Sequence, residues 1–215
     1  MYGVKDAVDF FDMVGQTGWH RDIQRTLIHW MGLRDADVVL EAGCGAGHFV
    51  LQLAQRVRWI TGLDAVESML KRAQRNAEDH ELDNANFVLG DVRHLPFPEH
   101  QFDRVICMNL LFMFEHPDGP LAELLRVTKP GGEVVLLNPS TSMNPWSAQS
   151  FCEANRLCDF ERDSLLSWAT AAARYGTVSE TGLAKRVTSF GGTVTESLKL
   201  LDGMALVSRI VKSAS

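Results

Sequence analysis

Three carboxylates follow short, β-branched stretches of the sequence. Glu41 precedes a loop with glycines at positions 43, 45 and 47, Asp64 follows Thr61-Gly62-Leu63, and Asp91 follows Phe87–Gly90. Parallel strands end at one edge of a sheet, so we expect the three acids to line one edge. Acids beside a loop of bare main chain suit a ligand that carries hydroxyl, amine or cationic groups.

The glycine loop, Gly-Cys-Gly-Ala-Gly over residues 43–47, joins a predicted strand to a predicted helix. Glycine allows a tight turn and lets a ligand lie against the backbone, although a plain strand-to-helix turn is the alternative interpretation. The dinucleotide pattern G-x-G-x-x-G is broken, because His48 or Val50 stands where its third glycine belongs. Glu41 would also repel a pyrophosphate. An NAD-dependent oxidoreductase is therefore disfavoured.

The later strand ends suggest separate tasks. Asp64 can accept hydrogen bonds from the 2′- and 3′-hydroxyls of a ribose. Asp91 beside Val92 suits a nucleobase, with a carboxylate for the amine and an apolar neighbour for the ring, and Asn109 ends the next strand. Each residue alone is more typical of a solvated side chain or a helix cap. Their alignment with the glycine loop favours one binding site.

The elements that position these residues alternate along the chain. Strands are predicted at 38–40, 59–63, 87–89, 104–108 and 134–137, with helical patterns between them. This alternation predicts an α/β fold, Rossmann-like and doubly wound, with a mostly parallel sheet covered on both faces. Runs at 193–201 and 204–211 are separated by Asp202-Gly203, which predicts an antiparallel hairpin with a two-residue turn.

Two segments lie outside this alternation of strands and helices. Residues 4–32 and residues 139–190 both carry helical patterns, and we expect them to pack near the carboxyl ends of the strands. We therefore divide the chain, as one domain, into an N-terminal helical lid (1–36), a core (37–138), a helical insertion (139–190) and the hairpin (191–215).

Composition excludes several classes. The net charge is −6, from 21 basic and 27 acidic residues, and basic residues are scattered, so nucleic-acid or membrane-surface binding is disfavoured. No apolar run approaches the ~20 residues of a membrane helix, and no signal peptide is evident. We expect a soluble, cytoplasmic protein. The 4 cysteines form no CxxC pair, and no His or Cys spacing suggests a metal.

The ordered motifs VVLEAGCGAG, TGLD, GDVRHLPFP, FDRVICMN and RVTKPGGEVVLLN, with the hairpin, cover roughly half of the chain. In these motifs the sequence resembles the class I S-adenosylmethionine-dependent methyltransferases, particularly the small-molecule branch with the ubiquinone and menaquinone biosynthesis enzymes. The resemblance implies a seven-stranded sheet with an antiparallel last strand. It also implies S-adenosyl-L-methionine as cofactor and S-adenosyl-L-homocysteine as product.

The resemblance also assigns cofactor contacts. Glu41 and Gly43 would hold the methionine end of the cofactor, and Asp64 would hold the ribose. Gly45 and Gly47 would be further cofactor contacts.

Around the adenine, Asp91 would meet the amine and Val92 would offer its backbone amide, while Ala65 and Met69 would pack on the ring. Asn109 would lie near the methionyl group or the sulfonium.

The resemblance implies methyl transfer by in-line displacement, which needs mainly proximity and orientation of the reactants. A residue of the N-terminal helices, Arg25 or Arg21, would meet the cofactor carboxylate. Candidates for a general base are His116, His20 and Glu115. The alternative for His116 is a loop residue at the start of a helix that contacts nothing, and the alternative for His20 is a solvated surface residue. No metal is expected.

The acceptor side stays open at this point. Eight large apolar side chains in the two outer segments could line a partly apolar acceptor pocket or simply form core: Phe10, Phe11, Met13, Trp19, Met143, Trp146, Phe151 and Trp168. The acceptor is expected to be a small molecule, methylated on oxygen, nitrogen or carbon. The alternative function is a non-catalytic regulatory protein that binds S-adenosylmethionine or S-adenosylhomocysteine. Monomer and homodimer both remain open.

Overall fold

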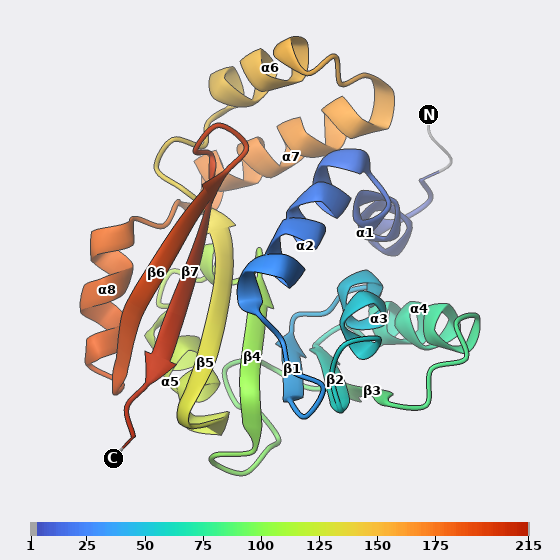
Figure 1. Cartoon of the computed structure of the whole chain (residues 1–215). Coiled ribbons are helices and arrows are strands. Elements are labelled where there is room, and N and C mark those ends of the chain that lie inside the picture. The colour runs from blue at the N-terminus through green and yellow to red at the C-terminus, as the bar shows by residue number, and fades with distance from the viewer. Residues whose placement is uncertain (1–3, 215) are drawn as a thin grey trace.

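The computed structural model describes residues 4–214 and contains one seven-stranded sheet of order β3-β2-β1-β4-β5-β7-β6 (Figure 1). β1 to β5 are parallel, whereas β7 pairs antiparallel with both β5 and β6. The strands are β1 (Val38–Ala42), β2 (Trp59–Asp64), β3 (Ala85–Leu89), β4 (Phe102–Met108), β5 (Thr128–Pro139), β6 (Gly192–Leu200) and β7 (Ala205–Lys212).

Helices cover both faces of this sheet and one of its edges. They are α1 (Ala7–Gly15), α2 (Gly18–Met31), α3 (His48–Ala54), α4 (Glu67–Glu78), the 3-10 turn η1 (Leu111–Met113), α5 (Asp118–Val127), α6 (Pro145–Ala154), α7 (Asp159–Tyr175) and α8 (Glu180–Thr188). α2, α3 and α4 lie on one face and α5 and α8 on the other, while α7 crosses above the carboxyl ends of the strands (Figure 1).

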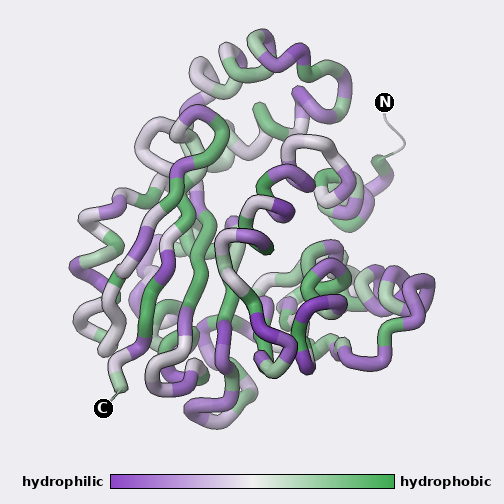
Figure 2. The backbone as a smooth tube through the Cα atoms, in the orientation of Figure 1, coloured by the Kyte–Doolittle hydropathy of each residue, from purple (hydrophilic) through white to green (hydrophobic). Residues whose placement is uncertain are grey.

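Successive side chains of the buried strands point to opposite faces of the sheet and so contribute to two hydrophobic cores. Val39 and Ile106 pack with the helices of the first face, whereas Leu40 and Val105 pack with α5 and α8. All four side chains are 0% exposed, because strands covered on both faces point apolar residues both ways. The central strands accordingly appear as continuous hydrophobic stretches in Figure 2.

The predicted fold class is confirmed, with seven strands in the expected directions. The predicted helical region 4–32 consists of two helices, because the chain leaves helical geometry at Thr17, the N-cap of α2. The division of the chain into four segments stays a prediction, and its limit at residue 138 falls within β5. Residues 1–3 and 215, at the ends of the first and last segments, lie outside the described residues.

The hairpin is antiparallel as predicted, but the prediction of a two-residue turn is wrong. Leu200 pairs with Ala205, so four residues link β6 and β7. Leu201, Asp202 and Gly203 all have positive φ, at 50°, 52° and 89°. Met204 joins the turn and is 2% exposed within the first core, so its burial outweighs the local preference for a tighter turn.

Among the described residues, no helix combines the length and the apolar character that crossing a membrane requires. The four cysteines are free thiols, and Cys44, Cys107 and Cys152 are buried.

Candidate functional site

The loop between β1 and α3 adopts left-handed backbone at its three glycines. Gly43, Gly45 and Gly47 have φ of 82°, 53° and 81°, values that side chains disfavour. A Cβ on Gly43 would lie 2.9 Å from Leu110 Cδ2, and one on Gly47 would lie 2.9 Å from Ala73 Cβ. A Cβ on Gly45 would meet no atom within 4 Å. The main chain at Gly45 is therefore open to a ligand.

Asp64, the last residue of β2, is bound to this loop. Its Oδ2 accepts a hydrogen bond from the backbone N–H of Gly45 at 2.9 Å, and its Oδ1 accepts one from Val66 at 2.9 Å. An ionised carboxylate has about four acceptor positions, so Asp64 can hold the loop and still accept further hydrogen bonds. The ribose contact stays a prediction, and the geometry leaves room for it.

Glu41 is a buried acid near the end of β1, only 2% exposed. It accepts a hydrogen bond from the backbone N–H of Val50, but its Oε2 has no partner among the described residues. Burial, and then the nearby charge of Asp64, raise the pKa of Glu41 well above its usual value. A buried carboxylate without a partner is costly, so this position favours a cationic ligand group.

Asn109, directly after β4, offers a second unsatisfied oxygen. Its φ is 55°, its backbone N–H donates to Leu137 O at 2.7 Å, and its Oδ1 is buried without a described partner. β4 neighbours β1, so Glu41 and Asn109 belong to adjacent strands at the same edge of the sheet. Two neighbouring buried oxygens without donors fit a ligand that supplies donors or positive charge.

Asp91 is already engaged. Arg93 Nε lies 3.0 Å from its Oδ1 and 2.9 Å from its Oδ2, and the backbone N–H of Arg93 donates to Oδ1 at 2.8 Å. These hydrogen bonds lower the pKa of Asp91. Val92 is buried beside it. An adenine amine would therefore share the Asp91 carboxylate with Arg93, and both predicted contacts remain predictions.

The remaining predicted cofactor contacts are unevenly placed. Ala65 is exposed just after β2, whereas Met69 is buried on the first turn of α4. Arg25 lies on the exposed side of α2 and pairs with Asp22, one turn earlier, and its contact with the cofactor stays a prediction. Arg21 lines a small cavity with His48, closer to the loop.

Of the three candidate bases, His20 is the least exposed, and it is partly buried. Its Nδ1 is shielded from solvent without a partner among the described residues. Burial, and then the charge of nearby His48, lower the pKa of His20 to about 4, so its ring is neutral at physiological pH. His116 and Glu115 are exposed, and Glu115 lines a cavity beside η1.

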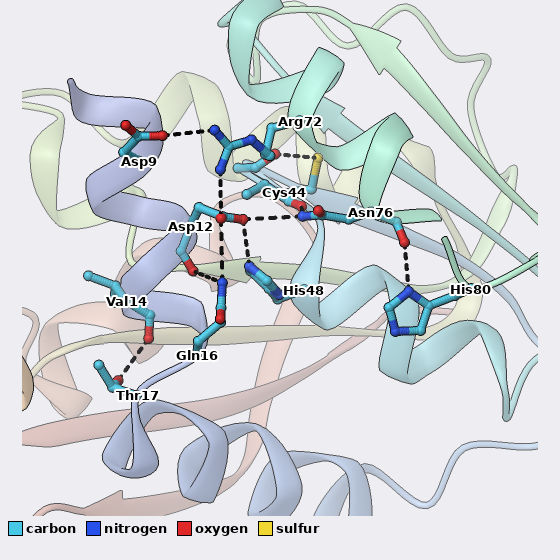
Figure 3. Close-up of polar contacts among 12 residues, drawn as sticks. Asp9, Asp12, Val14, Gln16, Thr17, Cys44, His48, Arg72, Asn76 and His80 are labelled. Atoms are coloured by element: carbon cyan, nitrogen blue, oxygen red, sulfur yellow. Dashed lines mark hydrogen bonds and ion pairs between the residues drawn. The ribbon is translucent and has the colours of Figure 1, made fainter. Parts of the chain in front are cut away.

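A polar network that the sequence analysis missed fixes α1 to the rest of the site (Figure 3). Asp12 Oδ1 lies 2.9 Å from His48 Nε2 and 3.2 Å from Asn76 Nδ2. Asp12 Oδ2 accepts from Arg72 at 2.6 Å, and Arg72 also donates to Asp9 at 2.8 Å. α1 is thereby tied to α4 and to the first residue of α3, which directly follows the glycine loop.

The sequence indicates the two helix faces that form this network, but not the contact between them. Asp9 and Asp12 are three residues apart and Arg72 and Asn76 four, so each pair shares one helix face. Nothing in the sequence indicates that these two faces meet. Gly15 is a further requirement, because a Cβ there would lie 2.3 Å from the ring of His48.

The two outer segments meet through aromatic side chains. The rings of Trp19 and Trp168 stack with centroids 5.8 Å apart and planes at 12°, and Trp19 Nε1 donates to Ser164 Oγ at 3.2 Å. Phe11 and Trp146, by contrast, are 53% and 77% exposed. The eight apolar residues suggested for an acceptor pocket therefore do not form one lining.

Two cavities adjoin these segments. One of about 380 Å³ lies between α2, α6, α7 and the β6–β7 turn and is lined by Trp19 and Phe151. The other, of about 280 Å³, lies between η1 and the α7–α8 connection and is lined by Phe112 and Asn138.

Comparison with known proteins places this geometry in a family. The family model described as a methyltransferase domain matches residues 33–192. A malonyl-[acyl-carrier protein] O-methyltransferase of Serratia marcescens is 32% identical over 170 residues, which cover 74% of this chain and 62% of that protein. The chain thus spans less than two thirds of the length of this relative.

Solved structures share the fold. A SAM-dependent methyltransferase from Aquifex aeolicus has a TM-score of 0.71 at 15% identity, covering 97% of this chain and 99% of that one. An N-methyltransferase from Bradyrhizobium japonicum in complex with S-adenosylhomocysteine has a TM-score of 0.66 at 19% identity, covering 93% and 90%. The chain belongs to the methyltransferase domain family and has the fold of the class I S-adenosylmethionine-dependent methyltransferases, as its motifs predicted.

Proposed function

We propose that this protein transfers the methyl group of S-adenosylmethionine to a small-molecule acceptor. The observation that carries the proposal is the buried Glu41 carboxyl, whose Oε2 lacks a partner among residues 4–214, beside a glycine loop that is hydrogen-bonded to Asp64. A buried acid in this state fits the ammonium group of the cofactor's methionine end. The same reasoning assigns the unpartnered Asn109 Oδ1 to the methionyl or sulfonium side.

The remaining assignments rest on position. Asp64, with acceptor positions left after its two backbone hydrogen bonds, would hold the ribose hydroxyls. Asp91 and Val92 would meet the adenine, with Arg93 keeping the Asp91 carboxylate ionised and oriented. These residues bind and align the cofactor without reacting with it.

The proposed reaction requires little covalent chemistry from the protein itself. When bound, the cofactor supplies a methyl group that is bonded to a positively charged sulfonium sulfur, and this sulfur leaves as a neutral thioether. A lone pair of the acceptor forms the new bond to the methyl carbon while the carbon–sulfur bond breaks. Holding two reactants in such an in-line geometry is worth ~7–11 kcal/mol, so alignment and exclusion of water are the main tasks.

The segments above the strand ends suit those tasks. α1 is tied to α4 and α3 by Asp12, and α2 is tied to α7 by the stacked Trp19 and Trp168. Together they would shield the methyl group from water. His20, a neutral ring without a partner, would accept a hydrogen bond or a proton there.

Two measurements test the proposal. Calorimetry and thermal unfolding with S-adenosylhomocysteine or NAD should show binding and stabilisation by the former alone. Isotope-labelled methyl transfer should then be measured with a panel of quinols, phenols and amines.

The outcomes separate the alternatives. Stabilisation by NAD instead of S-adenosylhomocysteine would overturn the assignment of the cofactor. Tight cofactor binding without transfer to any acceptor would favour the non-catalytic regulatory function. Transfer to a panel member, abolished when S-adenosylhomocysteine is added in excess, would support the enzyme.

A further inference from the structure

The 280 Å³ cavity beside η1 is a second site next to the proposed cofactor site. η1 begins two residues after Asn109, and its residues Leu111 and Phe112 form one wall of the cavity. The opposite wall comes from the connection between α7 and α8, including Val178, and from the first turn of α8, including Gly182. The cavity therefore lies at the carboxyl ends of β4 and β5.

One of the polar side chains that line this cavity is deeply buried. Asn138, on β5, is 2% exposed and lines it together with Leu121 and Leu183. Its Oδ1 accepts the backbone N–H of Phe112 at 3.2 Å, which fixes the orientation of the amide. Among residues 4–214, the Nδ2 of Asn138 makes no hydrogen bond, and this nitrogen is not sealed from solvent. A donor held in place on a largely buried side chain and open to the cavity is available to a ligand or water that enters it.

This donor lies close to the proposed methyl position. Met108 pairs with Leu137 in the parallel register of β4 and β5, so Asn109 and Asn138 follow on adjacent strands. The backbone N–H of Asn109 donates to Leu137 O at 2.7 Å. Neighbouring strands lie about 4.8 Å apart, so a group bound at Asn138 lies one strand away from Asn109.

Size and charge limit the occupant. At about 30 Å³ per water, the cavity holds the equivalent of about nine waters, which suits a molecule with a single ring. Its mouth has one acid, Glu115, and one base, Arg186, which pairs with Asp118 at 2.6 Å. These two charges are opposite in sign and the remaining lining residues carry none, so an uncharged ligand is favoured.

We propose that this cavity, the Asn138 cavity, binds the methyl acceptor as an uncharged, single-ring molecule whose oxygen accepts a hydrogen bond from Asn138 Nδ2. This inference rests on the proposed function. It makes Asn138 a positioning residue that holds the acceptor for the in-line attack. Glu115, at the mouth, would lie on the route by which the acceptor enters.

The test uses the full chain, labelled with ¹⁵N and loaded with S-adenosylhomocysteine, and benzamide as the probe. Asn138→Asp keeps the oxygen that accepts from Phe112 and replaces the donor with an acceptor. Benzamide should shift the Asn138 side-chain amide resonance, and Asn138→Asp should weaken its binding by about tenfold or more, the effect of one lost hydrogen bond. Asn155→Asp, the same change in the 380 Å³ cavity, should leave it unchanged.

A second variant guards against a misfolded Asn138→Asp protein. Thr177 is exposed at the cavity, so Thr177→Trp should close the mouth without entering the core and should abolish benzamide binding. Benzamide that fails to bind, or that binds these variants as well as the unchanged protein, overturns the inference. A shift centred on Trp19 and Phe151 also overturns it, because the probe then occupies the other cavity. If S-adenosylhomocysteine itself does not bind, the proposed function fails instead.

Discussion

Replacing Glu41 with glutamine should change stability and cofactor affinity in opposite directions. Burial raises the pKa of Glu41, so the folded protein binds its proton more tightly than the unfolded chain does. Stability is therefore lost as pH rises and Glu41 ionises without a partner. Glu41→Gln removes this cost but also removes the negative charge proposed to meet an ammonium group.

The magnitudes follow from the missing partner. A buried polar group without a hydrogen bond costs about 1–3 kcal/mol and a charged one more, and glutamine removes only the charge, so the ligand-free variant should gain about 1 kcal/mol or more at pH 8. For a chain of this length the gain corresponds to roughly 2–4 °C in Tm per kcal/mol. A lost charge-assisted hydrogen bond costs about 1.5–3 kcal/mol, so Kd for S-adenosylhomocysteine should rise about 10- to 150-fold.

The assay combines thermal unfolding of the ligand-free protein at pH 6 and pH 8 with calorimetric titration of S-adenosylhomocysteine. The gain in Tm should be larger at pH 8, where the unchanged Glu41 is more ionised. Glu78→Gln, an exposed glutamate of α4, serves as the control and should change neither quantity. Unchanged affinity, or a Tm that falls in the Glu41 variant, would refute the reasoning.

Three further predictions concern neighbouring groups. Asp64→Ala should weaken S-adenosylhomocysteine binding by about 2–4 kcal/mol in calorimetry, whereas the exposed Asp83→Ala should not; equal affinities would remove the ribose assignment. Asp12→Ala should accelerate hydrogen exchange of residues 7–15 while the central strands stay protected, and unchanged exchange would mean that packing alone holds α1. His20 has a pKa lowered from 6.5 to about 4, so the unfolding free energy should fall by at most about 3 kcal/mol as pH drops through that window. His20→Asn should flatten this part of the pH profile, and an equally steep profile would contradict the assignment.

The fold was predictable because its signals are local and repeated. β-branched runs alternating with helical patterns specify parallel strands covered on both faces, and the structure has them at the predicted places. The turn at 201–204 was not predictable from Asp202-Gly203 alone. Burial of Met204 decides its length, and burial depends on residues far away in the sequence.

The candidate site also contains residues that could be predicted from the sequence and residues that could not. Glu41, Asp64 and the glycines could be found because strand ends and glycine spacing leave a mark in the sequence. The engagement of Asp91 by Arg93 could not, since neighbouring charges in a sequence do not reveal side-chain direction. Asn138 ends the motif RVTKPGGEVVLLN, but its place in a cavity could not be inferred from the sequence, because three separate segments enclose that cavity.

The stacking of Trp19 on Trp168 has a consequence for engineering acceptor choice. The pair joins stretches of chain almost 150 residues apart, and the backbone N–H of Gly18 reinforces the joint by donating to Glu161 at 2.7 Å. A chimera that imports only one of these stretches from a relative would break a matched aromatic interface. Chimeras should therefore exchange the stretches that carry Trp19 and Trp168 together, as one structural unit.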